Sequence, residues 1–186
     1  MTRAGKPSAS ADTYMYALLA ERMLGRPLVE YVSTWMDRGS ALEAEAVDFY
    51  SFTRDQETVK VGFILNEAGT IGASPDRLVG DDGLLEIKVP KESTHVGYLL
   101  GKPVDQEYKQ QVNGQLWIAE RQWLDVLSYC PELPPALIRV ERDEDFITIL
   151  HDAVWAFSDK LEELARELTD RGWIKEAIGD AAQSMA

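Results

Sequence analysis

Two acidic residues and a lysine lie on either side of a predicted β-turn. Asp76 follows Pro75, and after nine intervening residues Glu86 and Lys88 flank Ile87 in an apolar stretch. Residues two apart in a strand project from the same face of a sheet, and pairing of the two hairpin strands brings Asp76 beside Glu86. The sequence therefore predicts two carboxylates and one ammonium group on a single surface.

This group of side chains is typical of a magnesium site. Two carboxylates suit a hard divalent cation such as Mg²⁺, which binds oxygen ligands and keeps waters that a substrate phosphate can replace. Such a cation generates a nucleophile from bound water and offsets charge on the phosphate under attack, and Lys88 would orient that water. The alternative is a turn at Asp76 and a simple ion pair between Glu86 and Lys88. The apolar neighbours favour the metal site, because unpaired charges are costly to bury.

The overall charge limits the ways in which the chain could bind a partner. Lys and Arg number 19 against 32 Asp and Glu, which gives a net charge of −13. This excludes a protein that holds nucleic acid through bulk positive potential. Any contact with DNA must therefore be local.

Length and composition indicate one intracellular domain. The chain has 186 residues, of which 45% are hydrophobic, and we predict a single domain over 1–186 with a peripheral tail from about residue 170. A lone cysteine, Cys130, excludes an internal disulfide and a four-cysteine metal site. No apolar run approaches the roughly 20 residues of a membrane helix, and the first ten residues lack the apolar core of a secretory signal.

The elements that would position the hairpin follow from hydrophobic spacing. Apolar residues repeat at helical spacing in four stretches, at about 13–24, 40–52, 105–120 and 145–169. Stretches rich in β-branched and aromatic residues predict strands at 58–65, 71–79, 84–88, 123–129 and 136–141. The turn Gly80–Gly83 joins the second and third of these into a meander with the first. This order predicts an α/β fold with a mixed central β-sheet flanked by helices.

Four motifs in this order resemble one nuclease family. Together they are similar to the PD-(D/E)xK nucleases with a restriction-endonuclease-like core, and within them to the lambda-exonuclease or YqaJ-like viral recombinase family. The matching segments are Arg3–Ser10, Gly39–Ala46 with its Gly-x-x-x-Glu-x-x-Ala pattern, Ser74–Asp76 with Glu86–Pro90, and the glutamine helix Tyr108–Trp117.

The resemblance implies roles for the residues at the matching positions. Asp76, Glu86 and the backbone carbonyl of Ile87 would bind Mg²⁺, with Mn²⁺ as a substitute, and Lys88 would be the catalytic base or the lysine that orients water. Glu43 would be an additional acid near the metal, or otherwise a solvated helix acid.

Further roles implied by the resemblance concern water and the DNA end. Gln111 would help hold the active-site water or the metal shell, and its alternative is a cap on a backbone group. Arg3, Ser10 and Ser74 would bind the 5′-phosphate of a DNA end. Ser10 is also a natural N-cap, a role compatible with anion binding.

The activity implied by the resemblance is a Mg²⁺-dependent 5′-to-3′ exonuclease on double-stranded DNA ends. The remaining 3′ single strand would serve a single-strand annealing protein in phage-type recombination. The resemblance also implies a ring-shaped homotrimer, encoded by a phage or prophage and acting in the bacterial cytoplasm, with no membrane partner. Two alternatives remain open: another nuclease of this fold, either an endonuclease or a RecB-like single-strand exonuclease, and a non-catalytic scaffold that binds DNA or protein.

Overall fold

The described chain forms two compact units. The computed structural model describes residues 8–28 and 34–174, without the side chains of 34–41 and 105–107. One unit comprises the described parts of residues 1–30 and 151–186, and the other those of 31–150. Helix α5 (Glu144–Asp170) contributes to both units. The single domain predicted over 1–186, with a peripheral tail from about residue 170, stays a prediction.

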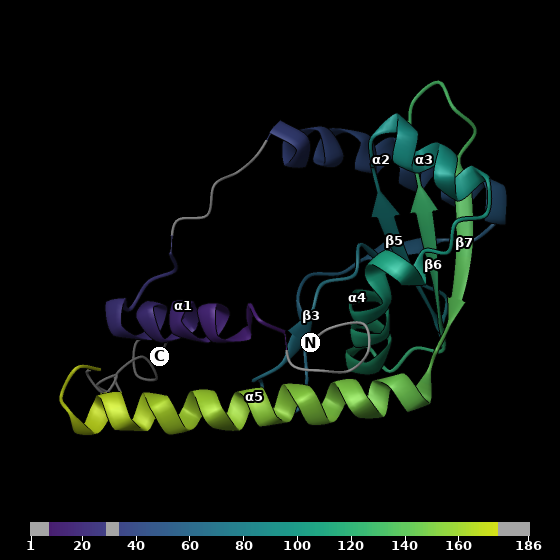
Figure 1. Ribbon diagram of the computed structural model, residues 1–186. Helices are drawn as coiled ribbons and strands as arrows, with labels where there is room; N and C mark the ends of the chain where they lie inside the picture. The colour runs from purple at the N-terminus through teal and green to yellow at the C-terminus, as the bar shows by residue number, and fades with distance from the viewer. Residues whose placement is uncertain (1–7, 29–33, 175–186) are drawn as a thin grey trace, which may run out of the picture. The chain divides into compact units, whose positions relative to one another are not determined.

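A five-stranded mixed sheet forms the centre of the second unit (Figure 1). Its strand order is β1-β4-β5-β6-β7, and only β5 and β6 pair in parallel among these neighbours. This is the α/β arrangement with a mixed sheet that the sequence predicts. The strands are β1 (Thr58–Lys60), β4 (Arg77–Val79), β5 (Gly83–Lys88), β6 (Trp123–Ser128) and β7 (Ala136–Glu141).

Successive residues of β5 enter different cores, because side chains alternate across a strand. Leu85 packs with residues of α2 (Thr34–Arg54), including Ala46 and Tyr50. Leu84 packs with the cluster that contains Val112 and Leu116 of α4 (Asp105–Ile118), and this cluster also includes Tyr98 of α3 (Glu92–Leu99). Glu86 and Lys88, two and four residues after Leu84, therefore project towards α4.

Two of the predicted strands are interrupted in the structure. The stretch 58–65 gives β1 and, after a break, β2 (Ile64–Leu65), whereas 71–79 gives β3 (Gly72–Ala73) and β4. Strands β2 and β3 pair in a separate small sheet. Pro75 explains the second break, because proline has no N–H group to donate to a ladder. The prediction of continuous strands here is wrong.

The helices agree with the sequence prediction, with two differences. Helix α2 begins at Thr34, before the expected start near residue 40, and the eight-residue helix α3 was not predicted. Helix α3 contains Thr94, Val96 and Gly97, residue types with low helix propensity. Tertiary packing of Tyr98 and His95, which are both buried, therefore stabilises α3.

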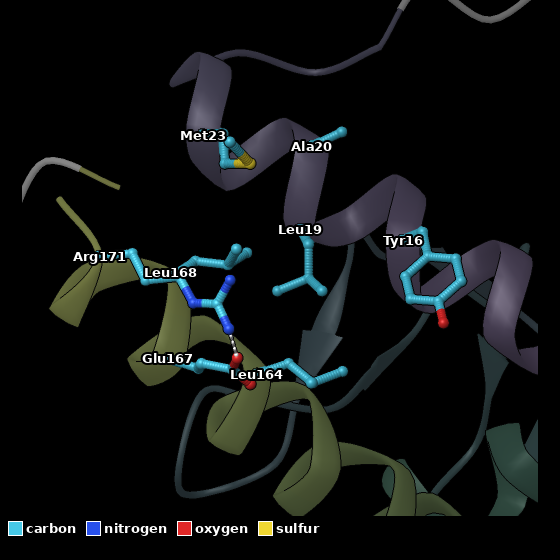
Figure 2. A pocket seen from close by; sticks show the side chains of 8 residues that line it. All are labelled: Tyr16, Leu19, Ala20, Met23, Leu164, Glu167, Leu168 and Arg171. Carbon is cyan, nitrogen blue, oxygen red and sulfur yellow. Dashed lines mark hydrogen bonds and ion pairs between the residues drawn. The ribbon is translucent and has the colours of Figure 1, made fainter. Parts of the chain in front are cut away.

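The first unit consists of helix α1 (Ala11–Leu24) and the part of α5 that follows residue 150. Met15 and Leu19 pack against Leu161 and Ala165, as the apolar stripes of both helices predict. Between the two helices lies a hollow of about 330 Å³ (Figure 2). The hollow is lined by Tyr16, Leu19, Ala20, Met23, Leu164, Glu167, Leu168 and Arg171. None of these residues is a predicted site residue.

The described residues contain no helix that is both long and apolar enough to cross a membrane.

The contact between Gly83 and Trp123 allows a test of the sheet. These residues face each other in the β5–β6 pair, and a Cβ atom on Gly83 would lie 2.2 Å from atoms of the indole ring. We expect Gly83→Ala to lower the free energy of unfolding by about 1–3 kcal/mol through overpacking. Urea unfolding followed by circular dichroism measures this effect.

The matched control is Gly114→Ala in helix α4. A Cβ atom there meets only Leu150, at 3.7 Å, which is an ordinary contact. Since alanine favours a helix over glycine, the free energy of unfolding should rise by about 0.5–1 kcal/mol. Equal effects of the two substitutions would contradict the close approach of Trp123 to Gly83.

Candidate active site

The pairing of β4 with β5 brings the two predicted acids together. In this antiparallel pair Arg77 faces Leu85 and Leu78 faces Leu84, so the next position places Asp76 opposite Glu86. The Asp76 Oδ2 atom accepts a hydrogen bond of 2.6 Å from the backbone N–H of Ile87. The structure therefore brings Asp76 against the segment that carries Glu86, as the sequence predicts, and the charge of Glu86 acts on it.

Both carboxylate oxygens of Glu86 are held by donors, and the side chain is 7% exposed. Its Oε1 atom accepts hydrogen bonds of 2.7 Å from Lys88 Nζ and from Gln111 Nε2. Its Oε2 atom accepts one of 2.8 Å from Gln115 Nε2. A carboxylate has about four lone-pair positions, so about one remains for a further ligand.

The ammonium group of Lys88 is fixed by its neighbours. In addition to the contact with Glu86, Nζ donates a hydrogen bond of 3.0 Å to Gln111 Oε1. It also lies 4.6 Å from the centre of the Tyr108 ring, in a cation–π contact. Tyr108 has a non-helical backbone, with φ −121° and ψ 15°, which marks a kink in α4. The lysine is therefore held beside both the acid and helix α4.

The pKa of Asp76 is raised to about 6, mainly by burial and next by the charge of Glu86. The hydrogen bond from Ile87 and the charge of Lys88 act in the opposite direction. Negative charge at this place is therefore only partly compensated by the protein. A divalent cation would supply the missing positive charge.

The donor set fits magnesium rather than a metal that needs many protein ligands. Among the described residues, no group of three or more His, Cys, Asp or Glu side chains is placed to hold a metal ion. Mg²⁺ is commonly bound by one or two carboxylates, with waters and substrate phosphate completing its shell. Asp76, Glu86 and the carbonyl of Ile87 could provide such a set, and their role as metal ligands stays a prediction.

Glu43 lies on helix α2 and reaches the Asp76 segment through Arg77. Its Oε1 atom forms an ion pair of 2.7 Å with Arg77 Nη1, and the same nitrogen donates a hydrogen bond of 2.6 Å to the backbone carbonyl of Asp76. Glu43 is close enough to contribute to the raised pKa of Asp76, but the guanidinium group offsets its charge. Its role as an additional acid near a metal stays a prediction.

The three predicted phosphate-binding residues are not joined in one described site. Arg3 lies outside the described residues. Ser10 precedes α1, and its hydroxyl contacts that of Ser8 at 2.8 Å and makes no capping hydrogen bond to the helix. Ser74 is exposed in the other unit, and its carbonyl accepts a hydrogen bond of 3.3 Å from Gln115 Nε2. A shared pocket stays a prediction.

Sequence reasoning missed Arg77 and Gln115 as supports of the two acids. Gln115 is four residues after Gln111, and residues at this spacing share one face of a helix. That signal could have placed both glutamines beside Glu86. For Arg77 no sequence pattern indicates the partner on α2, because the contact depends on how the helix packs against the sheet.

Two buried polar clusters in the same unit are structural. Asp125 is fully buried and accepts hydrogen bonds from Tyr50 at 2.8 Å and from Arg139 at 2.8 and 2.9 Å. His95 is also fully buried, its Nε2 donating to the carbonyl of Pro134 at 2.9 Å. Since the buried polar groups of Asp125 and His95 are satisfied by these partners, neither cluster is a candidate site.

Comparisons with known proteins agree with this geometry. Residues 5–122 match the model of the YqaJ-like viral recombinase domain. The chain is similar to an alkaline exonuclease (LHK-Exo) from Laribacter hongkongensis, with 34% identity, 91% of this chain and 90% of that chain covered, and a TM-score of 0.82. It is equally similar to LHK-Exo in complex with dAMP, with 34% identity, coverage of 91% and 89%, and a TM-score of 0.82.

A more distant likeness concerns the fold alone. A phage-related exonuclease from Haemophilus somnus 129PT is 15% identical, with 89% of this chain and 86% of that chain covered and a TM-score of 0.72. No curated protein matches the chain. The similar structures confirm the predicted fold class, a PD-(D/E)xK core with a mixed sheet between helices.

The raised pKa of Asp76 makes the stability of the cation-free protein depend on pH. A carboxyl group whose pKa rises from its ordinary value of 3.8 to about 6 on folding stabilises the fold below pH 3.8, and this contribution is lost as the pH rises through 6. Asp76→Asn should therefore be more stable than the wild type at pH 8, by up to about 3 kcal/mol.

The difference between the two proteins should shrink as the pH falls from 6 to 4. Denaturant unfolding in the presence of a chelator, repeated across this pH range, measures it. A variant that is less stable than the wild type at pH 8 would contradict the uncompensated charge at Asp76.

Proposed function

The chain belongs to the YqaJ-like viral recombinase domain family, and from this we propose that it is a Mg²⁺-dependent 5′-to-3′ exonuclease that degrades one strand of double-stranded DNA from its ends. Family membership and likeness to an alkaline exonuclease indicate a DNA exonuclease. The observation that carries the proposal is the hydrogen-bonded group formed by Glu86, Lys88 and Gln111 next to Asp76. The cation, the direction and the substrate end are the proposed details.

Asp76, Glu86 and the carbonyl of Ile87 would hold the cation, for which Mn²⁺ should substitute. When bound, Mg²⁺ activates water and offsets negative charge on the scissile phosphate. Asp76 Oδ2 is held by the N–H of Ile87, and Glu86 is held by its three donors, so the two carboxylates are oriented before any ligand arrives. This preorganisation reduces the cost of binding a cation.

Lys88 is the residue that acts on the reacting groups in this proposal. Its ammonium group is fixed by Glu86, Gln111 and the ring of Tyr108, and so presents a donor at a constant position. From there it would orient the attacking water or stabilise negative charge on the phosphate. Gln111 holds the lysine and the acid together, and Glu43, which is paired with Arg77, would be an additional acid near the metal.

The DNA end would be selected by its 5′-phosphate. Arg3 presents a guanidinium fork, and Ser10 and Ser74 present hydroxyl groups that can donate to phosphate oxygens. Ser74 is exposed and lies two residues before Asp76, so a phosphate on Ser74 would lie close to the carboxylate pair. The roles of Arg3 and Ser10 in this proposal rest on the resemblance of the segment Arg3–Ser10 to the family's motif.

Assembly and partners complete the proposal. A ring-shaped homotrimer would let an acidic protein, with a net charge of −13, keep DNA in a locally basic channel. The 3′ single strand would then pass to a single-strand annealing protein. We place this activity in the cytoplasm of a bacterial cell that carries the phage or prophage gene.

Three substitutions test the active site. Asp76→Ala and Glu86→Ala should each abolish metal-dependent degradation of linear duplex DNA, because each removes a cation ligand. Lys88→Ala should still bind the cation but lose activity by about 100-fold or more, since it removes the group that acts on water or phosphate. Release of acid-soluble nucleotides from end-labelled DNA in Mg²⁺ measures the rates.

The control is Lys160→Ala, which removes an exposed lysine from an i,i+3 ion pair on α5. This variant should retain wild-type activity. A circular duplex should remain intact, since the enzyme starts at an end, and cutting of the circle would indicate an endonuclease instead. Wild-type rates in all three site variants would refute the nuclease assignment of these residues.

The phosphate pocket predicts a preference between DNA ends. A duplex with a 5′-phosphate should be degraded faster than one with a 5′-hydroxyl. Arg3→Ala should reduce this preference more than it reduces cutting of the hydroxyl end, since a charged hydrogen bond is worth about 1.5–3 kcal/mol, or roughly 10- to 150-fold. Initial rates on the two substrates give the ratio. Equal rates with the wild type would contradict the pocket and leave the metal site untouched.

A further inference from the structure

Gln115 contacts both strand segments that carry the paired acids. Its Nε2 atom donates to Glu86 Oε2 at 2.8 Å and to the Ser74 carbonyl at 3.3 Å. Ser74 is two residues before Asp76, whereas Glu86 lies in β5 on the opposite side of the hairpin. One amide nitrogen of α4 therefore ties the two segments together.

The orientation of this amide is fixed by its partners. Both the Glu86 carboxylate and the Ser74 carbonyl are acceptors, so the NH₂ group must face them and the oxygen must point away. The side chain is 4% exposed, and its Oε1 atom is buried without a hydrogen-bond partner in the described structure. An orphaned buried oxygen costs free energy, so Gln115 is not the choice that stability alone would favour.

The two glutamines of α4 have different partners. Gln111 is exposed and links Glu86 to Lys88, the group proposed to act on the reacting atoms. Gln115 is buried, and its amide links Glu86 to the segment that carries Asp76. Gln115 is therefore placed to fix the distance between the Asp76 and Glu86 carboxylates, whereas Gln111 is placed to fix the ammonium group of Lys88.

We propose that Gln115 is a positioning residue for cation binding, which holds the Ser74–Asp76 segment at the distance from Glu86 that lets both carboxylates bind one ion. This inference rests on the proposed function, because it assigns a role towards the same cation. The Nε2 atom stabilises one carboxylate directly and the other through the backbone of its segment. The residue does not touch the reacting groups.

The test compares Gln115→Met with Asn113→Ala. Methionine has nearly the length of glutamine but no donor, so it removes both hydrogen bonds of Gln115 while filling the site. Asn113 is another buried amide of α4, which donates to the Lys109 carbonyl and accepts from the Asp143 N–H. Calorimetric titration with Mn²⁺ alone, without DNA, measures cation affinity in each protein.

We expect the dissociation constant for Mn²⁺ to rise about 10- to 100-fold in Gln115→Met and to stay at the wild-type value in Asn113→Ala. The half-saturating Mg²⁺ concentration for DNA degradation should rise by a similar factor in Gln115→Met. The rate at saturating Mg²⁺ should return to the wild-type value, because Lys88 and Gln111 are intact. A purely structural role would lower the rate at every Mg²⁺ concentration.

Each outcome bears on one of the two proposals. Equal Mn²⁺ affinity in the wild type and Gln115→Met would overturn the role of Gln115 and leave the exonuclease proposal standing. A wild-type protein that takes up no Mn²⁺ would instead overturn the cation site itself. If thermal unfolding shows that Gln115→Met does not fold, Gln115→Asn replaces it, since the shorter amide cannot reach both acceptors and should show the same loss of affinity.

Discussion

Repulsion between two neighbouring carboxylates is the constraint around which the sheet unit is organised. The register of β4 and β5 places Asp76 opposite Glu86, and burial then makes their negative charge costly, as the raised pKa of Asp76 indicates. Donors from three directions offset this cost: the backbone of β5, the ammonium group of Lys88, and the amides of α4. Helix α4 therefore has two roles. It packs Val112 and Leu116 into the core, and its amides of Gln111 and Gln115 stabilise the buried carboxylate of Glu86.

The opposite face of the sheet gives this arrangement a rigid support. There Asp125 of β6 is enclosed by Tyr50 and Arg139, and the Arg139 guanidinium lies 3.6 Å from the centre of the Trp123 ring. This network ties α2, β6 and β7 together through hydrogen bonds that are complete in themselves. The two faces of the sheet therefore differ. On the α2 face the buried charge of Asp125 is fully paired, whereas on the α4 face the negative charge of Asp76 and Glu86 is only partly compensated, which is where a cation would bind.

Local patterns predicted the parts of the site that lie within one hairpin or one helix. Alternation and turn chemistry place Asp76 beside Glu86, and helical spacing places Val112 and Leu116 on the face of α4 that packs on the sheet. The prediction was wrong where pairing partners decide the structure. Residues 58–65 read as one strand, although their two ends pair in different sheets, and α3 forms only because Tyr98 and His95 find buried places. The ion pair of Glu43 with Arg77 likewise needs the packing of α2.

Pro75 ends the upstream strand pairing immediately before Asp76. The number of residues in the chain therefore has different consequences before and after this proline. Upstream, the β2–β3 hairpin closes through Asn66, whose side chain accepts from Thr70 and Ile71 at 2.9 and 3.0 Å, and this turn can change length without altering the acid pair. Downstream, residues 77–79 pair one for one with residues 83–85, and a register shift of one position would turn one carboxylate to the face of α2. Insertions and deletions should therefore be tolerated in the β2–β3 turn, before Pro75, and should not be tolerated in the paired residues between Asp76 and Glu86.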